Sequence, residues 1–391
     1  MIPIFKVPRQ KPVLYRHNLI TALWAGIILL LSALPAEGQD NRLAGYGIEV
    51  GYVGGQVFKH SPKYNPPIPR YSQAIDINIL RQTCGKSDWE ERRHYPVIGL
   101  GMTYTDYGID SVYGKCFGIY PVLELPLVKG KKLEWTFRLG LGIGYVTQTY
   151  ERVPSWDTIN NAIGGHMNNF TMFASDLRYK INDQWAVSMG GNFSHISDAT
   201  WKIPNLGVNM YGAHVAVRYF PVTSKPERRK RTLEPLPNRW LMHARVGFSA
   251  NEYGVPDGPL YPIYTSSAFV SKRYAGKNKA YAGLDYSYHP SIVAFLKNNE
   301  VYPGKEKQHA WKSTVFIGNE FLLGRLGLVL QLGYYLKKGE LNEHKLCQKL
   351  GYNFYLIKNE KGALKELCLY SMLKTHRVQA EFIEFGMGLG L

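Results

Sequence analysis

The stretch that decides the fold is Leu133-Glu-Trp-Thr-Phe-Arg-Leu-Gly-Leu-Gly-Ile-Gly-Tyr145. Every second residue is a large apolar or aromatic side chain, and the residues between them are glycine, threonine or charged. A β-strand points successive side chains to opposite faces, so this pattern predicts a strand with two unlike faces. A face of glycine and charge cannot build the core of a soluble protein. It can line the lumen of a barrel whose other face meets lipid.

The same alternation recurs along the chain, for example over residues 240–248, 325–336 and 383–391. Counting such segments predicts about sixteen strands, an even number as in bacterial outer-membrane barrels. A secreted β-sandwich is the alternative, but its inward face would have to be bulky. The predicted strands are 43–57, 73–83, 95–107, 116–128, 132–149, 167–179, 184–197, 207–221, 239–252, 260–272, 278–288, 311–322, 325–337, 345–357, 363–374 and 377–391.

The sequence therefore predicts an all-β fold, an outer-membrane antiparallel β-barrel. Connections after even-numbered strands should be short periplasmic turns, whereas long connections such as 150–166 should be extracellular. Residues 222–238 break this rule, because they follow an even-numbered strand but are too long for a short turn. They are also basic and contain Pro235 and Pro237. This segment resembles a solvated linker between two eight-strand halves, which form either one large barrel or two barrels in tandem. We expect one large barrel, since tandem barrels in one chain are unusual.

The N-terminus has the pattern of an export signal. Lys6, Arg9, Lys11 and Arg16 precede an apolar run, which ends in Ala36-Glu-Gly38, with small residues where a signal peptidase cleaves. A transmembrane anchor is the alternative. We expect a signal peptide over 1–38, a first eight-strand segment over 39–222, a basic proline-containing linker over 223–238 and a second eight-strand segment over 239–391.

Charge and cysteine content narrow the partners. The formal net charge of +17 favours an anionic partner. Nucleic acid is a poor candidate for an exported chain, whereas phosphorylated outer-membrane lipid fits. Four cysteines allow three pairings in an oxidising compartment, and neither they nor the histidines have metal-ligand spacing. We expect no metal and no cofactor; the sequence does not indicate the oligomeric state.

Candidate chemistry lies near the end of the predicted strand 184–197. His195 and Ser197 are two residues apart, so they share a face with the lipid-facing side chains of that strand. Asn209 shares the outward face of the next strand. A serine nucleophile needs a base, usually histidine, a third group to orient the ring and an amide donor for the oxyanion. Asn209 and Asn205 are candidates for the last two roles.

The run His195-Ile-Ser197, followed by Pro204-Asn205-Leu-Gly207-Val-Asn209, resembles the signature of the lipid A 3-O-deacylase (PagL-type) family, also described as acyloxyacyl hydrolases. The resemblance extends over about residues 43–221, and the second half resembles longer members from Bacteroidetes-like genomes. It implies an outer-membrane esterase that cleaves acyl esters of lipid A in lipopolysaccharide. His195 would be the general base, Ser197 the nucleophile and Asn205 the oxyanion-hole side chain.

Two positions depart from the family pattern. Asn209 stands where the family has a glutamate, and an amide stabilises an imidazolium less well than a carboxylate does. Asp198 stands where an asparagine usually follows the serine. Two other functions stay open: a porin-like channel, which the sixteen predicted strands and the polar lumen favour, and a catalytically inactive barrel that binds lipid, which Asn209 favours.

Overall fold

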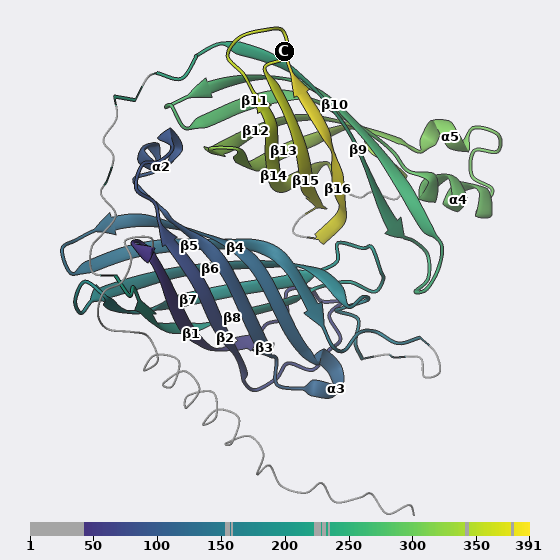
Figure 1. Ribbon diagram of the computed structural model, residues 1–391. Helices are drawn as coiled ribbons and strands as arrows, with labels where there is room; N and C mark the ends of the chain where they lie inside the picture. Colours follow the sequence, from purple (N-terminus) through teal and green to yellow (C-terminus); the bar gives the residue numbers. More distant parts are fainter. Residues whose placement is uncertain are drawn as a thin grey trace, which may run out of the picture.

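The computed structural model describes residues 43–391, except 153–156, 158, 223–227, 229–231, 234, 341–343 and 377–378. The predicted signal peptide and most of the basic run in the linker lie outside the described residues. The described chain forms two closed antiparallel barrels of eight strands each (Figure 1). The polar lumens and apolar outer walls are those of outer-membrane barrels.

The strands agree closely with the alternation in the sequence. The first barrel consists of β1 (Tyr46–Val57), β2 (Ser72–Gln82), β3 (Val97–Asp106), β4 (Lys115–Lys129), β5 (Leu133–Val146), β6 (Met167–Lys180), β7 (Trp185–Ser197) and β8 (Val208–Tyr219). The second consists of β9 (Trp240–Glu252), β10 (Leu260–Tyr274), β11 (Asn278–Tyr288), β12 (Trp311–Leu323), β13 (Leu326–Lys337), β14 (Leu346–Lys358), β15 (Glu366–His376) and β16 (Gln379–Gly390). All sixteen predicted strands are present.

The expectation of one large barrel was wrong. β8 pairs with β1 over Met210–Tyr219, and β16 pairs with β9, so each set of eight strands closes on itself. Because β1 is hydrogen-bonded to the edge of β8, that edge has no backbone groups left to pair with β9. The residues between 219 and 240 therefore connect two complete barrels.

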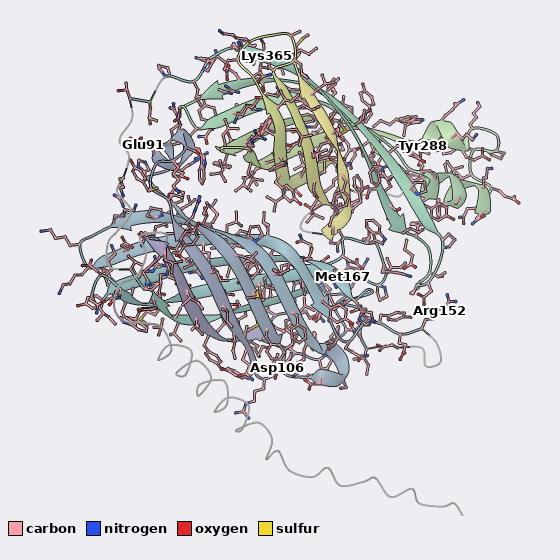
Figure 2. The ribbon with its side chains drawn as sticks, in the orientation of Figure 1. Glu91, Asp106, Arg152, Met167, Tyr288 and Lys365 are labelled. Carbon is pink, nitrogen blue, oxygen red and sulfur yellow. The ribbon has the colours of Figure 1, made fainter. Side chains whose placement is uncertain are left out.

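Short helices lie in the connections between the strands. They are α2 (Asp88–Arg92), α3 (Asp110–Tyr113), α4 (Pro290–Asn298) and α5 (Glu306–His309). Within the described residues, no helix combines the length and the apolar character needed to cross a membrane. We call the side of the connections after odd-numbered strands the loop end, and the side after even-numbered strands the turn end. Figure 2 shows Arg152, Met167 and Tyr288, from the loop ends of both barrels, toward one side of the molecule, with Glu91 and Lys365 from the turn ends toward another.

The lumen of the first barrel is filled by charged side chains and an apolar cluster. Glu124 receives two hydrogen bonds from Arg178, both of 2.8 Å, and two from Arg218, of 3.0 and 2.7 Å. Arg138 donates to Glu124 at 3.0 Å and also to Glu49. The apolar cluster includes Tyr64, Val112, Ala162 and Ile163 from the loop-end connections. An eight-stranded barrel is just wide enough for side chains to fill its lumen in this way.

The lumen of the second barrel is filled in the same way. Arg245 lies over the Phe269 ring, 4.4 Å from its centroid, within a buried aromatic cluster. Lys279 bonds to Glu366 at 2.6 Å on one side of that cluster, and Lys349 to Glu384 at 2.8 Å on the other. The four cysteines of the chain are all buried free thiols.

The charged network predicts a large penalty for Glu124→Gln. The substitution leaves three buried guanidinium groups with less negative charge, which typically costs about 3–5 kcal/mol. Asp110→Asn is the matched control, because Asp110 pairs with Lys115 at an exposed position and such pairs contribute about 0–1 kcal/mol. Urea unfolding in detergent micelles measures both variants. Equal unfolding midpoints for the two variants would contradict the structural role of the network.

Candidate active site

His195 and Asn209 face each other across neighbouring strands. His195 lies near the end of β7, Asn209 near the start of β8, and the two are direct partners in the antiparallel register. The Oδ1 atom of Asn209 lies 2.6 Å from Nδ1 of His195. An amide oxygen can only accept, so Nδ1 carries the proton and Nε2 of the neutral ring is free to accept one. That is the tautomer that a general base requires.

Ser197 follows two residues later on the same face of β7. Its side-chain oxygen accepts a hydrogen bond of 2.9 Å from Nδ2 of Asn205 and one of 3.2 Å from the backbone N–H of Ala199. Both donors belong to the connection 198–207 between β7 and β8, which we call the site loop. The hydroxyl is buried beneath that loop, with 6% of the residue exposed. The structure thus brings an amide side chain and a backbone N–H to the candidate nucleophile.

Gly207 occupies the space between the candidate base and nucleophile. A Cβ atom at this position would lie 2.7 Å from Cε1 of His195 and 3.2 Å from Cβ of Ser197. Its φ of +76° is also one that side chains rarely adopt. Within the described residues, no hydrogen bond joins Nε2 of His195 to Oγ of Ser197. Catalytic hydrogen bonds are often loose before substrate binds, and Gly207 leaves room for this one to form.

The neighbouring strand β6 adds two polar residues to the same face. Asn169 is the register partner of Ser197, and Thr171 is the partner of His195. Oγ1 of Thr171 donates to Oδ1 of Asn169 at 2.8 Å. Neither residue was predicted from the sequence, although the short turn between the predicted strands fixes this register. The polar outer surface around Ser197 thus spans three adjacent strands.

An aromatic surface adjoins this polar group on the outer wall. Phe193, two residues before His195 on β7, has its ring 6.2 Å from those of Phe58 and Phe173. Phe58 also contacts Tyr211, with centroids 5.7 Å apart. Met189, further along the same face of β7, is 66% exposed. As predicted, β7 therefore presents His195 and Ser197 on its outward face rather than to the lumen.

Asp198 does not take the place of the missing glutamate. Its carboxylate accepts a hydrogen bond from the backbone N–H of Lys202 at 3.3 Å, and no contact to His195 is found in the described part of the chain. Burial raises the pKa of the Asp198 carboxyl to about 7, and the nearby Glu252 carboxylate adds to the rise. The site loop therefore carries a carboxyl group that titrates near neutrality.

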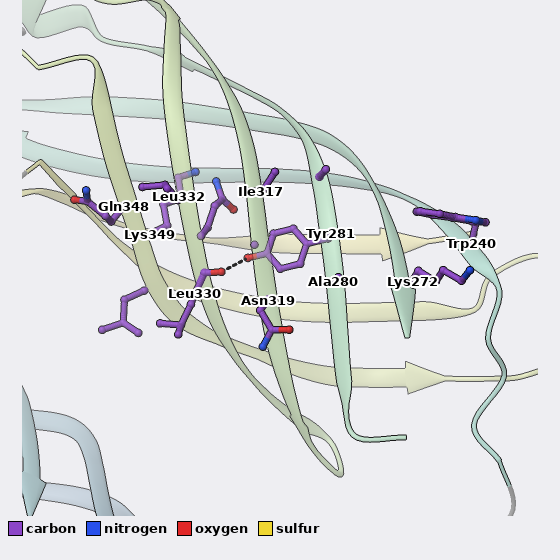
Figure 3. Close-up of a pocket in the computed structure, with 14 residues that line it drawn as sticks. Trp240, Lys272, Ala280, Tyr281, Ile317, Asn319, Leu330, Leu332, Gln348 and Lys349 are labelled. Atoms are coloured by element: carbon purple, nitrogen blue, oxygen red, sulfur yellow. Dashed lines mark hydrogen bonds between the residues drawn. The ribbon is translucent and has the colours of Figure 1, made fainter. Parts of the chain in front are cut away.

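A groove of about 730 Å³ lies elsewhere, on the wall of the second barrel (Figure 3). Its lining includes Ala280, Ala282, Ile317 and Leu332, and Tyr281 donates a hydrogen bond of 3.2 Å to the carbonyl of Leu330. None of the predicted site residues lines it. In the described chain, no group of histidine, cysteine or acidic residues could hold a metal ion.

Two family models match the chain, one on each barrel. Residues 75–218 match "Lipid A 3-O-deacylase (PagL)", and residues 238–390 match "Acyloxyacyl hydrolase, C-terminal domain". The chain belongs to the PagL lipid A 3-O-deacylase family. No curated protein matches the chain.

Solved structures resemble the PagL-family chain only weakly. The crystal structure of the outer membrane enzyme PagL is 17% identical, with a TM-score of 0.30, over 43% of this chain and 97% of that one. A BenF-like porin from Pseudomonas fluorescens is 12% identical, with a TM-score of 0.22, over 89% of this chain and 98% of that one. A mutant of the Rh. blastica porin is 8% identical, with a TM-score of 0.19, over 88% and 99%.

The Asp198 carboxyl predicts a pH effect on stability. The folded chain keeps this proton up to about pH 7, whereas an unfolded aspartate loses it near pH 4. Between these values the folded state binds more protons, so the free energy of unfolding contributed by Asp198 falls as the pH rises. Asp198→Asn should therefore lose less stability than the wild type between pH 5 and pH 8, measured by urea unfolding in micelles. Asp257→Asn, at an exposed carboxylate, is the control; a wild-type pH slope in Asp198→Asn would contradict the assignment.

Proposed function

We propose that this chain is an outer-membrane esterase that hydrolyses acyl esters of lipid A, with Ser197 as nucleophile and His195 as general base. One observation carries the proposal. The hydrogen-bonded pair of Asn209 and His195 lies next to Ser197 and its amide donor Asn205, on the outward face of a barrel. Polar groups on the outward wall of a membrane barrel are costly unless they are paired, and a cluster that pairs its own members there calls for a functional reason.

The first half of the reaction forms an acyl-enzyme. Nε2 of His195 takes the proton from Ser197 while Oγ bonds to the ester carbonyl carbon. The electron pair of the carbonyl moves onto its oxygen, beside the amide of Asn205 and the N–H of Ala199. When the tetrahedral intermediate collapses, the alcohol oxygen of the ester leaves and takes the proton from His195. Asn209 keeps the ring oriented throughout by accepting from Nδ1.

The second half releases the fatty acid. A water molecule gives its proton to Nε2 of His195 and attacks the acyl carbon of Ser197. The intermediate then collapses, the ester bond to Oγ breaks, and Ser197 recovers the proton from His195. This mechanism needs no metal or cofactor.

The position of the site favours a lipid substrate. The aromatic surface of Phe58, Phe173 and Phe193 borders the polar group on the outer wall, where an acyl chain in the bilayer can lie against it. The excess of positive charge on the chain suits the phosphates of lipid A. A porin-like function is disfavoured, because side chains fill the lumens of both barrels.

The proposal predicts that His195 and Ser197 act as one unit. His195→Ala and Ser197→Ala should each abolish fatty-acid release from lipid A, and the double variant should lose little more. When two groups act together, the effects of removing them are strongly non-additive. Independent contributions to the activation barrier would instead add in the double variant. Initial rates of fatty-acid release from purified protein in micelles measure this.

Ser194→Ala is the matched control for Ser197→Ala. Ser194 lies on the same strand but on its lumen side, opposite Met210, so its loss should leave the rate near that of the wild type. If the losses of the two single variants multiply in the double variant, the nucleophile–base assignment is wrong.

Asn209→Glu distinguishes a weakened enzyme from an inactive lipid-binding barrel. A carboxylate at this position would stabilise the imidazolium, and the stronger charged hydrogen bond is worth about 1.4 kcal/mol, or about tenfold in rate. A rise in fatty-acid release supports an active enzyme limited by Asn209. If the wild type releases no fatty acid and Asn209→Glu does, the natural chain is the inactive relative. A rise that persists in the Asn209→Glu, Ser197→Ala double variant would contradict the mechanism.

A further inference from the structure

The site loop adopts a conformation that needs external support. Ala199 and Thr200 have φ values of 54° and 67°, in the left-handed region that non-glycine residues rarely enter. Each such residue is strained and persists only where the surroundings hold it. This same conformation directs the N–H of Ala199 to Oγ of Ser197. The strain is thus located at one of the two donors to the candidate nucleophile.

The support comes from the second barrel. Glu252, the last residue of β9, donates its backbone N–H to the carbonyl of Thr200 at 3.1 Å. Its buried carboxylate accepts the N–H of Ile203 at 2.7 Å and lies 3.4 Å from Nζ of Lys202. Oγ1 of Thr200 donates to the carbonyl of Glu381, at the start of β16, at 2.6 Å. These bonds attach the site loop to the second barrel on either side of Lys202.

The two barrels also contact each other at their turn ends. The guanidinium group of Arg93, which follows α2, donates to the carbonyl of Lys277 at 2.5 Å and to that of Leu322 at 3.3 Å. Loop-end connections thus contact loop ends, and turn-end connections contact turn ends, with α2 between the barrels (Figure 1). Both barrels can therefore cross one bilayer in the same orientation while Glu252 holds the site loop.

We propose that the second barrel is a positioning element for the active site of the first, and that Glu252 is its principal positioning residue. This inference rests on the proposed function. Glu252 contacts neither Ser197 nor His195. It acts through the backbone of the site loop, and so fixes where the N–H of Ala199 and the amide of Asn205 lie relative to Oγ of Ser197. A family member built of the first barrel alone would have to support this loop differently.

The test compares Glu252→Ala with Glu252→Gln in the full-length chain, with Asp257→Ala as control. Glutamine keeps an oxygen that can accept from Ile203, whereas alanine does not. Asp257 contacts Lys202 at 3.4 Å but is exposed. Two readouts are measured in micelles: hydrolysis of a long-chain p-nitrophenyl ester, and hydrogen exchange of the amides of residues 199–203.

Glu252→Ala should lower kcat about 10- to 100-fold with KM within about twofold, because a displacement of about 1 Å at a reacting group has effects of this size. The site-loop amides should exchange faster. Glu252→Gln and Asp257→Ala should stay near the wild type in both readouts. Folding is judged by the heat-dependent shift of the protein in gel electrophoresis. If Glu252→Ala does not fold, Thr200→Ala is compared with Thr200→Ser, which keeps the hydroxyl that donates to the carbonyl of Glu381.

Unchanged exchange and unchanged kcat in Glu252→Ala would overturn the inference, as would an equal loss in Glu252→Gln. If the wild-type protein hydrolyses neither lipid A nor the p-nitrophenyl ester, the proposed function is contradicted. In that case hydrogen exchange still tests whether Glu252 holds the loop, so the two failures remain distinguishable.

Discussion

Strict alternation of side chains along a strand is the constraint on which this structure depends. In an eight-stranded barrel one face of every strand points into a lumen that side chains alone can fill, and the other points outward. Charged groups such as Glu124 and Arg218 satisfy one another inside. Outward positions are largely apolar, so a polar residue there stands out. His195, Ser197 and Asn209 are outward-facing polar residues of this kind, gathered at the loop end of β7 and β8.

The alternation made the strands predictable but not the closure of the barrels. Each strand carries its own pattern of faces, and so the sequence located β7 and the outward side of His195 correctly. Whether β8 pairs with β1 or with β9 depends on which distant edge reaches it, and the two edges carry the same kind of pattern. The basic, proline-containing segment after β8 suggested that the chain is divided into two halves. Such a linker is compatible both with one large barrel and with two separate barrels.

The candidate site was predictable to the extent that it follows strand register. The alternation places His195 and Asn209 on the outward faces of neighbouring strands, whereas their direct pairing depends on the path of the site loop between them. Gly207 was visible in the sequence, but its role between His195 and Ser197 depends on the path of the site loop. Glu252 could not be found from sequence, because its contact with Ile203 joins two separately closed barrels. Local patterns determine faces and partners within a hairpin, whereas contacts between barrels depend on how the two barrels pack.

The central claim is that Ser197 attacks an acyl ester of lipid A from the outer wall of the first barrel. Mass spectrometry of lipid A, after incubation with the purified full-length protein, tests it most directly. The account predicts lipid A lighter by one acyl chain with the wild type and with Ser194→Ala, and unchanged lipid A with Ser197→Ala. Equal loss of an acyl chain with Ser197→Ala, or no loss with the wild type, would contradict it.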